Sequence, residues 1–585
     1  MFISVIPALK MPFGHCFFDY EISEGEAHIG DLILVPFRNQ MIAGLVAKKS
    51  PKSAWADKAI KISNPRKIAK LPESIADFCI ISARESFVSP PTMLNAWLRK
   101  IPKRFSGETH ISLRNTTLPK DAKKNEVRYL VNRYVGALGI IETVTTNQAN
   151  GRVLLLTPWK HRVEFLSTKL GAPSLHKDIA YGEAWRIWMN FLNNPHGILI
   201  ATRLGAWLSI IADVVILDEP ENDDFKQDEL TPRYDARRIV KLAYDFNPSM
   251  RIISIGTTPN LADFAENAHL ASMSPTIDSD IEFARLDTMN RSPLEMLTNE
   301  AFTAMEEAVL NKNPIRILHT VLGMRGRVRC ADCDWLMECA SCKIGLRNMQ
   351  NHALCPRCEN KTELPMSCPR CGSTNLSKAI IGSEGLLKIC MANFPNADIK
   401  VLDLHEWVTQ PIQQNSLLII TNIAYIGGYV EDIRKQERLV LAFRRFASQA
   451  CVAKCKLIFQ GLSPLIDIAP SWLEPQGLAK QWELEIKDRQ EFLYPPTQKI
   501  CKLIQIGKSE HANMIKLKLE EICVKNPDWR FRGPYPIERF AKTREPRSIF
   551  HILPSKTATR TDLINELSVL TAYGIVDLDP IAFFC

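Results

Sequence analysis

Residues 330–371 read CADCDWLMECASCKIGLRNMQNHALCPRCENKTELPMSCPRC. The stretch holds four Cys-x-x-Cys pairs: Cys330/Cys333, Cys339/Cys342, Cys355/Cys358 and Cys368/Cys371. Two thiolates separated by two residues lie on one side of a tight turn, and two such pairs complete a tetrahedral S₄ site. The eight cysteines therefore predict two closed zinc sites. Because no coordination position stays open, we expect the metal to be structural and not catalytic.

The spacing of these cysteines leaves their pairing open, since four Cys-x-x-Cys units can be joined into two sites in three ways. Disulfides, unrelated thiol pairs and an iron–sulfur cluster remain alternatives to zinc. The chain has 16 cysteines, which in a reducing compartment suit ligand or core roles better than disulfides. A segment this short cannot build a comparable hydrophobic core, so we expect metal binding to supply its folding free energy.

Apolar runs that alternate with helical patterns extend outward from this cysteine module. Such runs, at this spacing, predict the buried strands of two parallel α/β lobes, of which the second is interrupted by the module. The runs before the module are residues 153–156, 198–202, 214–217 and 252–255, and those after it are residues 399–404, 417–421 and 456–460.

The pattern predicts a multidomain α/β protein. Short apolar runs bounded by turn residues, at 33–37 and 41–46, indicate a small β-rich domain at the start of the chain. An amphipathic helical pattern at 74–100 is followed by a basic, polar linker. The expected regions are the β-rich domain at 1–70, the helical segment and linker at 71–124, lobe 1 at 125–278, lobe 2 at 279–475 and an α+β domain at 476–585.

Composition restricts the class of protein. A chain of 585 residues with 46% hydrophobic and 23% charged residues indicates several globular domains and excludes a collagen-like or largely disordered protein. The net charge of +9 is compatible with a phosphate-rich partner. The first ten residues lack a basic segment and contain Pro7, so they predict a first strand and not a signal peptide. We expect a cytoplasmic protein.

Short motifs stand in a regular order on both sides of the module. They are Phe18-Asp19-Tyr20, Val35-Pro36-Phe37, Ala201-Thr202-Arg203, Asp218-Glu219-Pro220-Glu221, Lys226-Gln227, the segment 232–237, Gly256-Thr257-Thr258-Pro259, Gly382-Ser383-Glu384, Tyr494-Pro495-Pro496 and Gly533-Pro534. Their order and spacing, together with the cysteines, resemble the PriA family of replication-restart helicases over nearly the whole chain.

The resemblance implies a function for each region. It implies an N-terminal domain that binds the 3′ end of a nascent strand, a winged helix within 71–124, and two helicase lobes with the zinc module in the second. It also implies nested zinc sites, one of Cys330, Cys333, Cys368 and Cys371 and the other of Cys339, Cys342, Cys355 and Cys358. The partners implied are forked and single-stranded DNA, single-strand binding protein, and the replicative helicase with its loader, at the bacterial nucleoid.

Four residues correspond to the family's DNA contacts. The resemblance implies that Asp19 recognises a terminal 3′ hydroxyl, with Phe18 beside it. An acidic acceptor suits a sugar hydroxyl and repels a 3′ phosphate. Arg38 stands where the family has a glycine, and could crowd the pocket or add a phosphate contact. Lys58 matches the basic residue of the pocket by a looser alignment. The alternative for Asp19 is an ordinary turn residue.

The motor motifs of the family are incomplete in this sequence. The phosphate-binding motif G-x-x-x-x-G-K-[ST] is absent from its expected place, where Ile140 and Ile141 stand for the lysine and threonine. Asp218 and Glu219 close an apolar strand, where a Mg²⁺ ligand and a water-activating carboxylate would lie, and we interpret them as a solvated strand end inherited from a motor. The arginine motif of lobe 2 is replaced by residues 443–450, an expected amphipathic helix.

These observations predict a primosome-assembly protein that binds branched DNA and recruits the replicative helicase, with two zinc ions and without ATP turnover. ATP and Mg²⁺ are therefore not expected as working cofactors, and no catalytic residue is assigned. Two alternatives stay open: an active ATP-dependent 3′→5′ DNA helicase, and a zinc-bearing scaffold that binds proteins.

Overall fold

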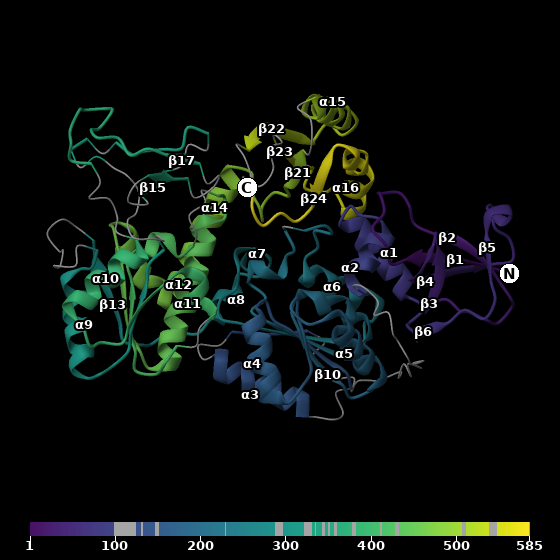
Figure 1. The fold of residues 1–585 in the computed structure, drawn as a ribbon, viewed down its shortest axis with the longest axis horizontal. Coiled ribbons are helices and arrows are strands. Elements are labelled where there is room, and N and C mark those ends of the chain that lie inside the picture. The colour runs from purple at the N-terminus through teal and green to yellow at the C-terminus, as the bar shows by residue number, and fades with distance from the viewer. Residues whose placement is uncertain are drawn as a thin grey trace.

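A computed structural model shows a chain of several packed domains (Figure 1). The N-terminal sheet lies at one end, lobe 1 in the centre and lobe 2 at the other end, with the C-terminal domain above lobe 1 in this view. The multidomain α/β class with parallel sheets and a β-rich N-terminal domain is confirmed. The structure describes residues 1–98, 125–129, 133–146, 151–228, 230–286, 296–320, 330, 332–333, 335–341, 345–348, 352–355, 360–376, 382–409, 412–427, 432–505, 510–537 and 547–583.

The N-terminal domain is a six-stranded sheet with the order β5-β2-β1-β4-β3-β6. Its neighbours are antiparallel except β2 and β5, which run parallel. Alternating side chains of β1 to β4 fill a small core around Val5, Tyr20 and Val35. The strands are β1 (Phe2–Pro7), β2 (Phe18–Ile22), β3 (Asp31–Phe37), β4 (Gln40–Ser50), β5 (Ile60–Ile62) and β6 (Lys67–Lys70).

Lobe 1 is a six-stranded parallel sheet with the order β7-β12-β11-β8-β10-β9. Its central strands are continuous apolar runs because helices cover both faces of the sheet. The strands are β7 (Asn125–Tyr129), β8 (Val153–Leu156), β9 (Ser174–Leu175), β10 (Ile198–Ala201), β11 (Val214–Asp218) and β12 (Arg251–Gly256). The helices are α3 (Arg133–Thr146), α4 (Lys160–Leu170), α5 (Tyr181–Asn193), η3 (Arg203–Ile211), η4 (Asp223–Phe225), α6 (Ala236–Phe246), α7 (Leu261–Glu266) and α8 (His269–Ser272).

Lobe 2 is a five-stranded parallel sheet with the order β13-β20-β19-β14-β18. Helices α7 and α8 contribute Leu261, Phe264 and Ala271 to its core, so the apolar contact between the lobes is continuous. The strands are β13 (Ile281–Arg285), β14 (Ile315–Leu318), β18 (Ile399–Leu402), β19 (Leu417–Ile420) and β20 (Lys456–Gly461). The helices are α9 (Asn299–Leu310), α10 (Ser383–Asn393), α11 (Leu404–Thr409), η5 (Ile423–Tyr425), α12 (Lys435–Ala453), α13 (Leu465–Ile468), η6 (Ala469–Leu473) and α14 (Pro475–Glu491).

Each apolar run that the sequence assigns to a strand of the lobes is a strand, with ends that differ by a residue or two. The cysteine module lies between β14 and α10 and forms a small antiparallel sheet beside lobe 2 (Figure 1). Its strands are β15 (Arg347–Asn348), β16 (Ala353–Leu354) and β17 (Lys361–Thr362).

The C-terminal domain packs two helices on a four-stranded antiparallel sheet with the order β22-β23-β21-β24. This arrangement is the expected α+β domain. Its elements are β21 (Cys501–Gln505), α15 (Glu510–Lys525), β22 (Arg530–Ile537), β23 (Arg547–Leu553), α16 (Arg560–Leu567), η7 (Ser568–Ala572) and β24 (Gly574–Asp577). Among the described residues, no helix combines the length and the apolar character needed to cross a lipid bilayer.

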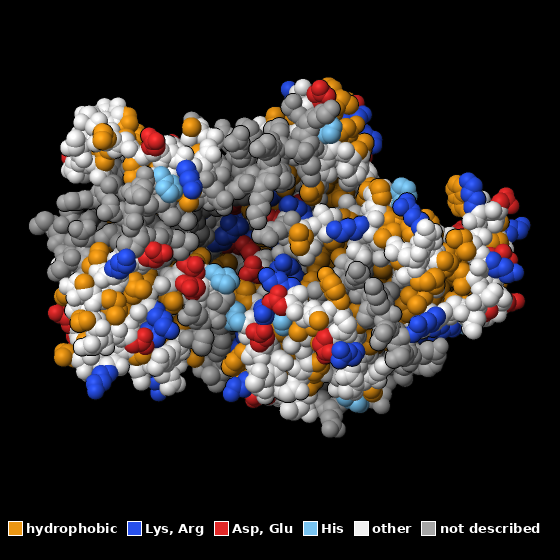
Figure 2. All heavy atoms as spheres, viewed as in Figure 1, with side chains coloured by type: hydrophobic (Ala, Val, Ile, Leu, Met, Phe, Trp, Pro, Cys, Tyr) orange, Lys and Arg blue, Asp and Glu red, His pale blue; other side chains and the backbone are white. Residues whose placement is uncertain are grey.

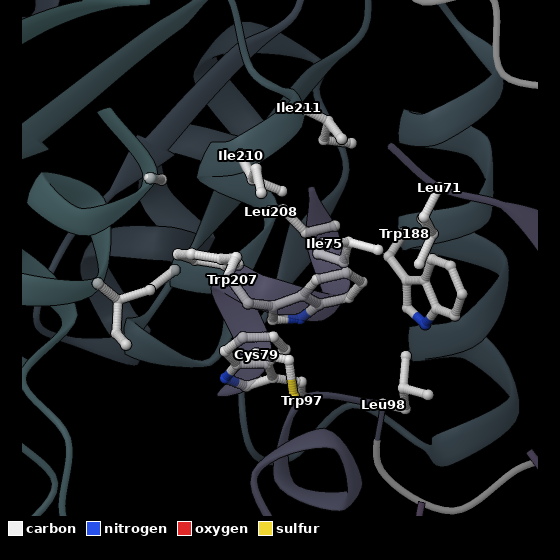
Figure 3. Packing of buried hydrophobic residues seen from close by; sticks show 14 of the residues in the cluster. Leu71, Ile75, Cys79, Trp97, Leu98, Trp188, Trp207, Leu208, Ile210 and Ile211 are labelled. Carbon is white, nitrogen blue, oxygen red and sulfur yellow. The ribbon is translucent and has the colours of Figure 1, made fainter. Parts of the chain in front are cut away.

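Two helices, α1 (Ile75–Glu85) and α2 (Pro90–Leu98), join the N-terminal sheet to lobe 1. Trp97 of α2 stacks on Trp207 of η3 with ring centroids 5.9 Å apart, and Trp188 of α5 meets Trp207 edge-on at 5.6 Å (Figure 3). Aromatic pairs of this kind contribute about 0.5–1.5 kcal/mol each beyond the burial of their area. One hydrophobic core therefore continues from the N-terminal sheet into lobe 1.

The helical pattern predicted for 74–100 is present but broken. Pro90 and Pro91 begin α2, where a missing N–H costs little, and Ser89 Oγ accepts the N–H of Thr92 at 3.3 Å. The winged helix predicted within 71–124 stays a prediction, because residues 99–124 lie outside the described part of the chain.

A buried ion pair connects the C-terminal domain to lobe 1. Lys226 Nζ lies 2.7 Å from Asp577 Oδ1, and the two side chains are 2% and 1% exposed. Burial lowers the pKa of Lys226, but the charges of Asp577 and Asp579 outweigh it and raise the pKa overall. Removal of either side chain of the pair would leave the charge of the other buried and uncompensated.

We expect Asp577→Asn to lower the free energy of unfolding by about 3–5 kcal/mol, because the Lys226 ammonium keeps its burial and loses its counter-charge. Urea-induced unfolding measures the change. The control is Glu566→Gln, which removes a pair with Lys525, a side chain 70% exposed, and should cost about 1 kcal/mol or less. Equal losses for the two variants would contradict the role of the buried pair.

Candidate functional site

Asp19 is held by two hydroxyl groups. It is the second residue of β2 and not a turn residue, and the strand register pairs it with Ser4 of β1. Ser4 Oγ donates to Asp19 Oδ1 at 2.7 Å, and the hydroxyl of Ser53 donates to Asp19 Oδ2. Ser53 lies in the connection between β4 and β5. The half-buried carboxylate therefore fixes this connection against the sheet.

The same connection carries Lys58 and Trp55. Ser53 Oγ accepts the backbone N–H of Trp55 at 3.0 Å. The indole of Trp55 is 61% exposed, and Lys58 Nζ lies 5.3 Å from its ring centroid, within the range of a cation–π contact. Hydrogen bonds thus link Asp19 through Ser53 to the backbone of Trp55, beside Lys58.

Phe18 and Arg38 form a separate group. Because side chains alternate along a strand, Phe18 faces away from the side of the sheet that carries Asp19. Phe18 meets Phe37 edge-on at 5.0 Å, and the guanidinium of Arg38 lies 5.9 Å from the Phe37 ring. Arg38 has a φ of 54°, a left-handed conformation that glycine adopts without cost and that costs another residue about 1–3 kcal/mol. The four predicted contacts therefore divide between two faces.

Four cysteines of the module converge. The Sγ atoms of Cys330, Cys333, Cys368 and Cys371 all lie within 4.8 Å of one another. The distances Cys330–Cys371 and Cys333–Cys368 are both 3.6 Å between sulfurs. A disulfide needs about 2.05 Å, whereas a zinc ion with bonds of about 2.3 Å places its thiolates about 3.8 Å apart. These residues fit a zinc ion, and they are the outer four of the nested pairing.

The second set of cysteines is described in part. Cys339 and Cys355 are 2% and 0% exposed and lie in one apolar cluster with Leu346, against which Trp335 packs. Cys342 and Cys358 lie outside the described residues. The second zinc ion therefore stays a prediction.

Asp218 and Glu219 at the end of β11 are both 0% exposed, so the interpretation of a solvated strand end is wrong. Arg162 of α4, whose side chain is 1% exposed, donates its Nε to Asp218 Oδ2 at 2.9 Å. A carboxylate without water needs a nearby positive charge. Here a guanidinium of the chain itself, that of Arg162, supplies this charge.

A helix occupies the segment where the resemblance places the phosphate loop. Strand β7 ends at Tyr129 and α3 begins at Arg133. Residues 135–142 are helical throughout, and Ile141 is fully buried against the lobe 1 sheet. In a phosphate-binding motif the residues before the lysine form an open loop whose N–H groups face the ligand.

Helix α12 of lobe 2 reaches this edge of lobe 1. Its residues Phe443 and Phe446 are buried, as expected of an amphipathic helix. Two arginines beside them were not anticipated. Arg444 Nε donates to Thr258 Oγ1 at 2.9 Å, and Arg445 Nη2 lies 3.4 Å from Glu219 Oε2. The guanidinium of Arg445 also lies 5.0 Å from the ring of Trp159 in lobe 1.

The start of α12 makes a second ionic contact with lobe 1. Asp223 Oδ1 accepts from Arg434 at 2.7 Å, and Asp223 Oδ2 accepts from Arg438 at 3.0 Å. Burial raises the pKa of Asp223, but the two guanidinium charges outweigh it and lower the pKa overall. Figure 2 shows basic and acidic side chains around a hollow at the centre of this face, between the lobes and the C-terminal domain.

Several of these residues carry no motif. Ser4, Ser53, Arg162 and Arg445 act through partners far along the chain, and nothing in their local sequence marks them. Trp55 is different, because a lone tryptophan between charged and small residues in a polar segment is itself a signal of an exposed contact.

We expect Cys371→Ser to lower the zinc content by about one ion per chain, since the S₄ site loses a ligand. A chromogenic chelator measures the zinc released from the denatured protein. The control is Cys451→Ser in α12, whose thiol donates to the backbone carbonyl of Asp278 at 3.2 Å and lies outside the cluster. Unchanged zinc content in Cys371→Ser would contradict the site.

Known proteins resemble this chain in sequence over part of its length. Residues 7–98 match the family of PriA 3′DNA-binding domains (3′BD). Replication restart protein PriA of Borreliella burgdorferi is 22% identical over 430 residues, which cover 67% of this chain and 61% of the relative. PriA of Thermotoga maritima is 22% identical over 495 residues, which cover 75% and 65%. The chain thus spans less than two thirds of the length of these relatives. The chain is thus a distant relative of the replication restart protein PriA, and its residues 7–98 match the family of PriA 3′DNA-binding domains.

Proposed function

We propose that the protein takes part in replication restart: it binds branched DNA with a free 3′ end and brings the replicative helicase and its loader to that site, without ATP-driven unwinding. The observation that carries the proposal is Asp19, a carboxylate on a strand of the matched domain with exposed basic and aromatic groups beside it. Single-strand binding protein is a further partner, and the site of action is the bacterial nucleoid.

The chemistry of the Asp19 site suits a 3′ terminus. A carboxylate accepts the hydrogen bond of a 3′ hydroxyl and repels a 3′ phosphate. Lys58 supplies a positive charge for the adjoining phosphate, and the net charge of +9 favours a polyanionic partner. Contacts to sugar and phosphate read no base sequence, so the shape and the end of the strand would determine where the protein binds.

We expect the protein to bind a fork with a 3′ hydroxyl at least about tenfold more tightly than the same fork with a 3′ phosphate, since a hydrogen bond to a charged group is worth about 1.5–3 kcal/mol. Asp19→Asn should reduce this ratio to about threefold or less. Fluorescence anisotropy at several salt concentrations measures it. The control is Glu24→Gln, an exposed acidic residue of the same domain. Equal binding of both forks by the unmodified protein would overturn the proposal.

Three observations support a function without ATP turnover. Helix α3 stands where a phosphate loop would lie, Arg162 compensates the charge of Asp218, and Arg445 reaches Glu219 from the other lobe. In a working motor of this class the corresponding carboxylates act on Mg²⁺ and water, and arginines of the second lobe act on the transferred phosphate. In this chain the arginines contact the carboxylates directly.

The contacts of α12 also bear on how the lobes move. A motor opens and closes its lobes with bound nucleotide. Here Asp223 binds Arg434 and Arg438, and Thr258 binds Arg444, all across the boundary between the lobes. The apolar cluster of lobe 2 adds Leu261 and Phe264 from the lobe 1 side. These ionic, hydrogen-bond and apolar contacts can hold the two lobes together without a bound nucleotide.

We expect no ATP hydrolysis above background with or without forked DNA, and no change in the distance between the lobes on addition of ATP and Mg²⁺. Fluorophores at residues 169 and 312, which are exposed on lobes 1 and 2, report the distance by energy transfer. Asp223→Ala should lengthen it, because Arg434 and Arg438 of lobe 2 lose the carboxylate that they contact in lobe 1.

The control for this experiment is Asp178→Ala, whose partner Lys160 lies in the same lobe, so the distance should not change. ATP hydrolysis that forked DNA stimulates would contradict the proposed absence of ATP turnover and would favour an active helicase. If the protein binds its protein partners but does not bind forked DNA even at low salt, the result would favour the alternative of a zinc-bearing scaffold that binds proteins.

A further inference from the structure

Trp55 is the large aromatic residue tied to the Asp19 side of the sheet. Its backbone N–H lies 3.0 Å from Ser53 Oγ, and the same hydroxyl donates to Asp19 Oδ2. Trp55 lies two residues after Ser53 and immediately precedes the short helix η1 (Ala56–Lys58). One oxygen atom, Ser53 Oγ, therefore connects the Asp19 carboxylate to the Trp55 backbone.

The exposure of Trp55 needs an explanation. Its side chain is 61% exposed, and the core of the domain is complete without it. A ligand that covers an exposed indole removes apolar surface from water, which is favourable. The short helix η1 has no buried residue, so this connection contributes little to folding. The exposed side chains of Trp55 and Lys58 in this connection are therefore available to bind a ligand.

Phe18 cannot take the same role. It lies on the opposite face of β2 and its ring packs edge-on against Phe37 at 5.0 Å. On the face that carries Asp19, the strand register places Ser4 next to Asp19 on one side and next to Lys48 on the other. Lys48 is exposed, with its Nζ 4.9 Å from the Phe17 ring. Asp19 thus stands between basic residues and beside one exposed indole.

We infer that Trp55 stacks on the base of the 3′-terminal nucleotide while Asp19 accepts the 3′ hydroxyl. Lys58, beside the ring, then meets the phosphate on the 5′ side of that nucleotide. This inference rests on the proposed 3′-end binding and adds a specific contact to it. Stacking on an indole accepts every base, because every base has a π-face. The site therefore requires a base but reads no sequence.

A double-mutant cycle between protein and DNA tests the contact. The protein is the full chain with tryptophan or alanine at residue 55, and the DNA is a fork whose 3′-terminal nucleotide either carries its base or is abasic. Loss of a stacked base weakens binding by about 5- to 100-fold. We expect Trp55→Ala to cause a loss of this size on the intact end, and little or none on the abasic end.

Two further variants separate stacking from structure. Trp55→Tyr keeps an aromatic face and should restore most of the affinity, which a folding defect would not allow. Phe492→Ala removes another exposed aromatic ring, 57% exposed, at the end of α14, and should lower the affinity for both ends equally or not at all. Equal losses for Trp55→Ala on intact and abasic ends would overturn the inference.

The outcome for Trp55 can be told apart from the outcome for Asp19. If the unmodified protein distinguishes a 3′ hydroxyl from a 3′ phosphate but Trp55→Ala binds both intact and abasic ends as before, only the stacking contact is wrong. If the unmodified protein binds 3′-hydroxyl and 3′-phosphate forks equally, and also binds intact and abasic ends equally, the proposed 3′-end binding itself is wrong. A preference for the intact end that Trp55→Ala abolishes supports both.

Discussion

Buried carboxylates at the carboxyl end of the lobe 1 sheet require positive charge, and this requirement organises the centre of the molecule. Asp218 and Glu219 have no exposed surface, and water therefore cannot stabilise their charge. Arg162 supplies it from within lobe 1, and Arg445 supplies it from lobe 2. Because the second source lies on α12, compensation of charge and contact between the lobes are the same interaction.

The N-terminal and C-terminal domains are attached to the rest of the molecule by different kinds of interaction. The N-terminal sheet shares a hydrophobic core with it through α1 and α2, where Trp97 stacks on Trp207. The C-terminal domain is held by the buried pair of Lys226 and Asp577, and by Arg560, whose Nε lies 3.2 Å from Glu85 of α1. Figure 1 shows the N-terminal sheet and the cysteine module at opposite ends of this assembly.

The sequence alone determined the features that depend on local pattern. The strands of the lobes are apolar runs because both faces of a parallel sheet are buried, so they can be recognised without a partner. The cysteine pairs indicated a metal site because thiolate spacing is a local property of a turn. Asp19 was identified through a motif, and the match of residues 7–98 agrees with that resemblance.

Only the tertiary structure decided which charges meet. Arg162 and Asp218, Glu219 and Arg445, and Asp19 and Ser53 are brought together by sheet order and by the packing of α12, which no local pattern encodes. For the same reason the local sequence does not reveal that Asp218 is buried. Phe18 and Asp19 are adjacent in sequence but face opposite sides of a sheet. Periodicity and spacing describe neighbours along the chain, whereas the charge state and the reach of a side chain depend on neighbours in space.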